Sequence, residues 1–274
     1  MIAFALVRSG RLKSKTLSAA GVLAPLALVS SSVISEALLE EAQAEFADTP
    51  FPYPLTTQKE RTMRRLPVYL VIDTSGSMFG EPIEAVKNGL QMLVTSLRQD
   101  PYALETAYVS VITFSSEAKQ VVPLTELAQF QTPELVASGT TAMGEALTLL
   151  ADCIGREVQK GGADQKGDWK PVVFMLSDGS PTDDLDKGIK ALSTVKTGAF
   201  VCCAAGQAAD ASSLKKITEI VVNLDTADST SIKSFFKWVS SSISVSSQKI
   251  EQGKKEVAGL EDLPPPPPEV NVVM

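Results

Sequence analysis

The chain has 274 residues, a formal net charge of −7 at pH 7, and 44% hydrophobic residues. This length allows one or two domains with a substantial core, and the composition is ordinary for a globular protein. The negative balance, without long basic runs, argues against nucleic acid or an anionic membrane as the main partner, because both reward clustered Lys and Arg.

Residues 1–62 differ in composition from the rest of the chain. Basic residues precede Leu17–Val29, an apolar stretch interrupted by Gly, Pro and Ser. It resembles the hydrophobic part of an export signal, within residues 1–44, and it is too short and interrupted for stable membrane insertion. We interpret residues 1–62 as an N-terminal extension that is disordered, signal-like or not translated. The last alternative places the true start at Met63.

From residue 66 the pattern alternates between strands and helices. Buried strands are predicted at 66–72, 107–114, 171–176 and 199–205, with a short strand at 120–124 and a short edge strand at 217–224. Apolar residues recur at helical spacing over 83–97, 143–158, 185–192 and 232–243. Strands separated by such helices imply right-handed crossovers. We therefore expect one α/β domain over residues 63–248, a doubly wound, mostly parallel sheet flanked by helices.

The last part of the chain, residues 249–274, is charged and proline-rich. The consecutive prolines Pro264–Pro268 favour an extended polyproline II segment that cannot join a core. We expect a solvated tail, and the alternative is a docking peptide for a proline-binding module.

Catalytic chemistry is restricted by what the sequence lacks. Histidine is absent, which excludes Ser-His-Asp and Cys-His catalysis as well as histidine-based zinc sites. The cysteines, Cys153, Cys202 and Cys203, are odd in number, and two of them are adjacent in an apolar run. That usage is typical of buried thiols in a reducing compartment rather than of a disulfide framework.

Oxygen-bearing side chains occur in three loops of the predicted domain. Asp73, Ser75 and Ser77 follow the first strand, Thr140 opens the helix from residue 143, and Asp178 follows the strand at 171–176. In a doubly wound sheet, ligands bind outside the carboxyl ends of the strands, where such loops converge. We expect these five residues to meet there.

The residue types predict a site for a hard divalent cation. Mg²⁺ takes about six oxygen ligands and keeps several waters. Three hydroxyls and two carboxylates could supply the protein's part of that shell. Mn²⁺ is the alternative ion. Thr141 competes with Thr140 for the ligand role. Thr140 is favoured only by its place directly after Gly139. A coordination position remains for water or for a carboxylate from a partner.

The combination of Asp73-x-Ser75-x-Ser77, Gly139-Thr140 and Ser177-Asp178-Gly179 resembles the metal-ion-dependent adhesion site of von Willebrand factor type A domains. The resemblance spans residues 66 to about 248. It implies direct coordination by the two serines, and direct or water-mediated coordination by the threonine and the aspartates. It also implies a binding module rather than an enzyme, a protein partner that donates an Asp or Glu to the metal, and a shift of the helix at 232–243 on binding.

A second resemblance is less extensive. Met63–Leu70 and the proline-rich end are similar to bacterial TerY-like tellurite-resistance proteins. Those are stand-alone, cytoplasmic type A domains associated with a protein kinase and a phosphatase. The resemblance implies a cytoplasmic stress-response protein with such a pair as partners.

Two other functions fit part of the pattern. If residues 1–44 act as a signal, the chain is an exported or surface adhesin with the same metal chemistry. Alternatively, Asp73 at the end of a strand is where haloacid dehalogenase-like, Mg²⁺-dependent phosphatases carry their nucleophile. Those enzymes need a second acid two residues later, and that position is Ser75, a poor acid. A phosphate-binding P-loop is excluded because its glycine-lysine motif is absent from the sequence.

Overall fold

The computed structural model describes residues 64–162, 166–207, 209–251 and 259–273. Residues 61–274 form one compact unit. The predictions for residues 1–62, including the start at Met63, lie outside the described residues. Within the described ranges, no helix is long and apolar enough to cross a membrane.

A seven-stranded sheet forms the centre of this unit, in the order β3-β2-β1-β4-β5-β6-β7. Neighbouring strands from β2 to β6 are parallel, and β3 and β7 are antiparallel edge strands. The strands are β1 (Leu66–Asp73), β2 (Ala107–Phe114), β3 (Ala118–Glu126), β4 (Val172–Ser177), β5 (Phe200–Ala205), β6 (Ile220–Leu224) and β7 (Asn271–Val272).

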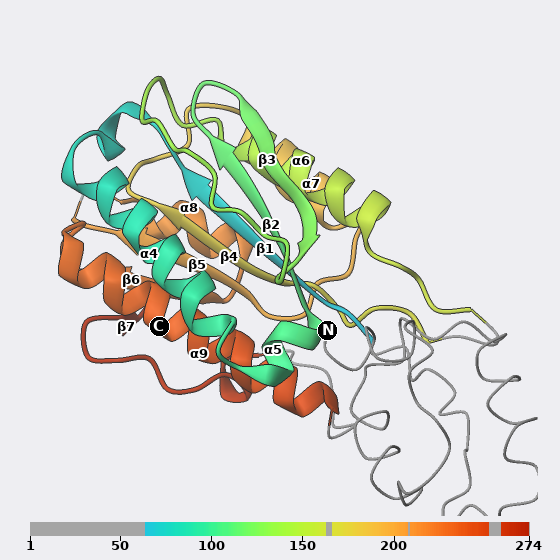
Figure 1. The fold of residues 1–274 in the computed structure, drawn as a ribbon. Coiled ribbons are helices and arrows are strands. Elements are labelled where there is room, and N and C mark those ends of the chain that lie inside the picture. The colour runs from blue at the N-terminus through green and yellow to red at the C-terminus, as the bar shows by residue number, and fades with distance from the viewer. Residues whose placement is uncertain (1–63, 163–165, 208, 252–258, 274) are drawn as a thin grey trace, which may run out of the picture. The chain divides into compact units, whose positions relative to one another are not determined.

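Helices cover both faces of the sheet, as Figure 1 shows. The helices are η2 (Gly76–Met78), α4 (Glu81–Leu97), α5 (Pro101–Thr106), α6 (Met143–Glu157), α7 (Leu185–Leu192), α8 (Ala211–Ile217), α9 (Ser229–Glu251) and η3 (Leu260–Asp262). Side chains alternate along a strand. In β1, Val68 and Leu70 therefore pack in the core beneath α4 and α9, whereas Tyr69 and Val71 pack beneath α6. The predicted doubly wound fold is confirmed.

Two elements differ from the prediction in ways that have a physical reason. The strand expected at 120–124 runs over Ala118–Glu126 and pairs antiparallel with β2; its alternating burial is that of an edge strand, so its apolar signal is weak. The short helix α5 was not predicted, because its residues carry no periodicity. It is held by Asp100, whose carboxylate accepts hydrogen bonds from the amides of Tyr102 and Ala103.

The expectation of a solvated tail is wrong for residues 259–273. Leu263 and Val270 are buried in the same core as α4 and α9, and the Trp238 Nε1 atom donates to the Pro264 carbonyl at 2.8 Å. The chain then pairs as β7 with β6, so β6 is not the edge strand that the sequence suggested. Prolines lack an amide donor but do not prevent their apolar neighbours from packing.

Candidate metal centre

The end of β1 turns sharply because of Asp73. This residue is fully buried, and its Oδ1 atom accepts a hydrogen bond of 2.8 Å from the amide of Ser75. Such an Asx turn reverses the chain at a strand end. The chain continues into η2, which leaves Ser77 exposed at the carboxyl edge of the sheet. The other oxygen of Asp73 accepts a 2.5 Å hydrogen bond from the hydroxyl of Ser177.

Four of the five predicted ligands form one hydrogen-bonded chain. The Oγ atoms of Ser75 and Ser77 lie 3.0 Å apart. The hydroxyl of Ser77 donates to Asp178 Oδ1 at 2.7 Å. With the contact between Asp73 and the Ser75 amide, these bonds connect the loops after β1 and β4, which are neighbouring strands in the sheet. The structure therefore brings Asp73, Ser75, Ser77 and Asp178 together.

The loop that carries Thr140 is tied to the same turn by its backbone. The amide of Gly76 donates to the carbonyl of Gly139 at 3.0 Å, and the amide of Ser138 donates to the carbonyl of Thr74 at 2.8 Å. The hydroxyl of Thr140 is exposed and hydrogen-bonded to Ser116 at 3.4 Å. The structure thus places this threonine beside the centre, and its hydroxyl is bonded to Ser116, in the loop after β2.

The competing residue, Thr141, is buried, and its backbone joins the threonine loop to the loop after β4. Its amide donates to the hydroxyl of Thr182 at 3.0 Å, and its carbonyl accepts from the Thr182 amide at 2.9 Å. These bonds fasten the threonine loop to the loop after β4. These bonds involve only the backbone of Thr141. A Cβ atom at Gly179 would lie 3.3 Å from Thr141 Oγ1 and 3.9 Å from Ser77 Oγ, so the Thr141 hydroxyl also faces the loops of the centre. Both threonines are therefore candidate ligands, and Thr140 is the exposed one.

The two carboxylates of the centre carry charge that the protein does not neutralise. Burial raises the pKa of Asp73 above its usual range, against hydrogen bonds from Ser177 and Ser75 that lower it, and Asp178 adds a further increase. Burial also raises the pKa of Asp178. Among the described residues, neither carboxylate pairs with a Lys or Arg. Two such groups side by side favour a cation between them.

The donor set fits a hard cation and not a soft one. The described part of the chain has no group of three or more His, Cys, Asp or Glu side chains that could hold a metal. The centre instead combines two carboxylates with hydroxyl oxygens, the ligands that suit Mg²⁺ and similar ions. Cys153, Cys202 and Cys203 are free and buried, as predicted. Burial raises the pKa of Cys153 to about 11, so it carries no thiolate to bind a metal or attack a substrate.

Two residues that support the centre were not assigned a role from the sequence. Ser177 holds Asp73 through its hydroxyl, and Ser116 accepts from both the amide and the hydroxyl of Thr140. The first could have been found from its place directly before Asp178 at a strand end. For Ser116 the sequence offered no signal, because its partner is 24 residues away.

With this fold and geometry, the family of the chain can be stated. The family model of the von Willebrand factor type A domain matches residues 68–238 of this chain. The chain therefore belongs to the von Willebrand factor type A domain family. Domains of this family commonly mediate metal-dependent protein interactions or adhesion.

Individual relatives are distant or match only in part. The chain is 35% identical over 123 residues to the uncharacterized protein sll0103 of Synechocystis sp., covering 42% of this chain and 26% of that protein. It thus spans about a quarter of the length of the curated relative that it matches.

Solved structures share the fold at low sequence identity. A von Willebrand factor type A protein from Catenulispora acidiphila has a TM-score of 0.52 at 20% identity, covering 66% of this chain and 43% of that one. The pilus adhesin SpaC from Lactobacillus rhamnosus GG, in its open conformation, has a TM-score of 0.52 at 15% identity, covering 66% of this chain and 30% of that one. At these identities the likeness is one of fold alone.

Proposed function

We propose that this protein is a metal-dependent protein-recognition module. Asp73, Ser75, Ser77, Thr140 and Asp178 would hold one divalent cation, Mg²⁺ or Mn²⁺, at the carboxyl edge of the sheet. When bound, the cation supplies a positive charge and an open coordination position for a carboxylate. The partner is a protein that presents an Asp or Glu to that position.

One observation carries this proposal. The carboxylates of Asp73 and Asp178 lie in one hydrogen-bonded chain with two serine hydroxyls and have no Lys or Arg partner among the described residues. Burying carboxylates without a counter-charge costs free energy, so such an arrangement is typical of a binding site. Because two carboxylates only balance a dication, a third carboxylate from a partner still gains from the contact.

Calorimetric titration with Mg²⁺ and with Mn²⁺ tests the metal site directly. Ser75→Ala/Ser77→Ala should weaken binding by about 100-fold, since even groups that only orient metal ligands contribute about 10–100-fold. The matched control is Ser96→Ala, which removes an exposed hydroxyl from α4 and should leave binding unchanged. Equal affinity in all three proteins would contradict the proposal. For a partner once captured, equal affinity in Mg²⁺ and in EDTA would contradict the carboxylate bridge.

We further propose that the module binds and does not catalyse. In the phosphatase alternative a second acid must stand two residues after Asp73, and Ser75 there donates at most a hydroxyl proton of high pKa. An assay with a generic aryl phosphate separates the two functions. Mg²⁺-dependent turnover that is lost in Asp73→Asn would overturn the binding proposal.

The narrower biological role rests on the resemblance to TerY-like tellurite-resistance proteins. Under this proposal the protein would act in the cytoplasm with a protein kinase and a phosphatase as partners, whereas a signal in residues 1–44 would make it an exported adhesin. Localisation of the full chain with a C-terminal tag, expressed from its own start, distinguishes these two roles. Unchanged tellurite sensitivity in a strain lacking the protein would count against the stress-response role.

A further inference from the structure

The two most exposed large apolar side chains of the described residues lie on the loops that build the metal centre. Phe79 is 79% exposed and Val136 is 70% exposed, whereas the next most exposed side chains of this kind reach 39%. Phe79 follows Ser77 by two residues, and Val136 precedes Ser138 by two. Because backbone hydrogen bonds join these two loops, at Ser138–Thr74 and Gly76–Gly139, two such side chains indicate a binding surface rather than scattered surface apolarity.

The exposure of Phe79 is imposed by a well-anchored backbone. Its neighbour Met78 is completely buried. Its own amide donates to the carbonyl of Gly76 at 3.2 Å, which closes η2. The ring is therefore presented outward by a fixed turn.

The same is true of Val136 on the other loop. Leu135 directly before it is 1% exposed, and the amide of Ser138 after it is bonded to Thr74, in the turn that carries the metal ligands. Each apolar side chain thus stands next to a buried residue and close in sequence to the centre. Among the described residues, no side chain covers either of them, since Phe79 is 79% and Val136 70% exposed.

The charge around the centre restricts what can occupy this surface. The loops after the parallel strands, residues 74–80, 115–117, 178–184, 206–210 and 225–228, contain no Lys or Arg. Their acidic residues are Asp178, Asp183, Asp184, Asp210, Asp225 and Asp228, together with Glu117, which pairs with Lys119 in β3. An acidic partner would be repelled unless the cation neutralises the centre, and basic residues around its carboxylate would be attracted.

We propose that Phe79 and Val136 form an apolar rim of the metal centre that selects the partner. The partner is a protein segment with one Asp or Glu for the cation, an apolar side chain within a few residues of it, and Lys or Arg farther out. This inference rests on the proposed function. A second copy of this chain fits poorly, because the chain carries a net charge of −7 and its loops at this edge are acidic.

The test uses an array of synthetic nonapeptides as the probe. Each has one central Glu or Asp, with Leu or Ser at the flanking positions and Lys or Asp at the outer ones. Binding of the full chain is measured in excess Mg²⁺ and in EDTA, for the wild type, Phe79→Ser/Val136→Ser and Met92→Ser. Met92 is a matched control, because it is 37% exposed on α4, away from the loops that carry the ligands. Calorimetry with Mg²⁺ on each variant reports whether the metal site is intact.

We expect Leu-flanked peptides with outer Lys to bind about tenfold more tightly than Ser-flanked ones in Mg²⁺. Phe79→Ser/Val136→Ser should remove this preference while its Mg²⁺ affinity and its binding of Ser-flanked peptides stay the same. Met92→Ser should behave as the wild type.

Each other outcome overturns a defined part of the reasoning. Mg²⁺-dependent binding with equal affinity for Leu- and Ser-flanked peptides would refute the apolar rim and leave the proposed function intact. Mg²⁺ binding by calorimetry without any bound peptide would refute the stated partner chemistry. Mg²⁺-dependent self-association that is lost in Phe79→Ser/Val136→Ser would make a second copy the occupant. Absence of Mg²⁺ binding in the wild type would instead refute the proposed function.

Discussion

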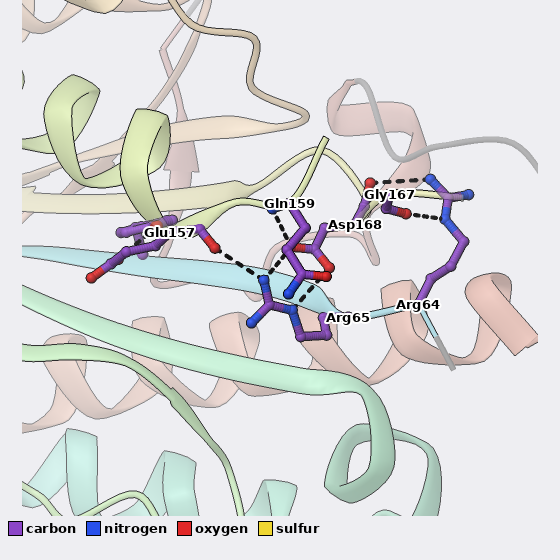
Figure 2. Close-up of polar contacts among 7 residues, drawn as sticks. Arg64, Arg65, Glu157, Gln159, Gly167 and Asp168 are labelled. Carbon is purple, nitrogen blue, oxygen red and sulfur yellow. Dashed lines mark hydrogen bonds and ion pairs between the residues drawn. The ribbon is translucent and has the colours of Figure 1, made fainter. Parts of the chain in front are cut away.

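The two ends of the central strand β1 differ in how their charged side chains are paired. At the amino end, Arg65 pairs with both oxygens of Asp168, at 2.9 and 2.6 Å, and donates to the carbonyl of Glu157 at 3.0 Å (Figure 2). At the carboxyl end, the partners of Asp73 and Asp178 within the described part of the chain are hydroxyl and amide groups. One end is neutralised within the protein, whereas the carboxylates of the other have no basic partner among the described residues, as the proposed cation site requires.

The amino end is a network of hydrogen bonds and ion pairs around Arg64 and Arg65. Arg64 donates to the carbonyl oxygens of Gly167 and Asp168, at 2.6 and 3.1 Å, as Figure 2 shows. The carboxylate of Glu157 accepts from Tyr69 at 3.0 Å and from Gln120 at 2.8 Å. Burial, together with the charge of Glu157, raises the pKa of Tyr69, so that its phenol stays a neutral donor. The amino end thus has the contacts expected of a stabilising network, whereas the carboxyl end has those expected of the proposed binding site, where stability is given up.

Breaking the neutralised end should have the largest effect. Asp168→Ala leaves the guanidinium of Arg65 partly buried without its anion and should lower the free energy of unfolding by about 3 kcal/mol. Urea denaturation measures this. The matched control is Asp152→Ala, which breaks an exposed pair with Arg156 on α6 and should cost far less, because solvent screens such a pair. Equal losses in the two variants would show that the network contributes no more than a surface ion pair.

The opposite response is expected at the carboxyl end. In EDTA, Asp178→Asn should leave the free energy of unfolding unchanged within about 0.5 kcal/mol or raise it, because the variant removes a charge that burial disfavours. With Mg²⁺ at 100 times its dissociation constant, the wild type should gain about 2.7 kcal/mol and the variant far less. Thermal unfolding in both buffers measures the difference. A large loss of stability in EDTA would mean that Asp178 is structural.

Two glycines with positive φ values lie in the loops at the carboxyl end. Gly139 and Gly80 have φ values of +78° and +89°, backbone conformations that most residues with a Cβ atom adopt only at a cost of about 1–3 kcal/mol. A side chain at Gly139 would also clash with the hydroxyl of Ser116, whereas nothing lies within 4 Å at Gly80. We expect losses of about 2 kcal/mol for Gly139→Ala and about 1 kcal/mol for Gly80→Ala in urea unfolding. Only Gly139→Ala should weaken Mg²⁺ binding. Equal Mg²⁺ affinity in the two variants would show that the threonine loop is not part of the metal site.

The smallest effect concerns an acid of the carboxyl edge that does have partners. Hydrogen bonds from Ser212 and Ser213 at the start of α8 lower the pKa of Asp210 to about 2. Because this folded-state pKa lies below the unfolded value, the stabilisation is present above about pH 4 and is lost as the pH falls toward 2. Asp210→Asn keeps the cap without titrating. The stability difference between wild type and variant should therefore shrink from pH 5 to pH 2.5 in urea unfolding; a constant difference would contradict the assignment.

The fold was largely predictable because burial on both faces leaves continuous apolar runs. All residues of β1 and β4 are buried, and the helices α4 and α6 carry their apolar residues at regular spacing. The prediction failed where packing depends on distant partners. The burial of Leu263 and Val270 is decided by the surface of α9 and β6, which no local pattern in a proline-rich segment reveals.

In the candidate site, too, local features were predictable and contacts with distant partners were not. Asp73, Ser75 and Ser77 belong to one turn, so their spacing alone brings them together. Asp178 followed from topology, because β4 lies beside β1. The orientation of a hydroxyl depends on three-dimensional neighbours, and the sequence did not reveal that Ser116 holds Thr140 or that Ser177 holds Asp73.

The packed C-terminal segment determines how α9 can move. The helix is fastened to this segment by Trp238 at Pro264 and by Lys249 at Asp262, and the segment ends as a strand on β6. A slide of α9 along its axis would pull on residues 260–273 and strain the bonds between β7 and β6. The last strand thus acts as a tether, and the exchange rate of its amide protons would report from the sheet edge whether the helix has shifted.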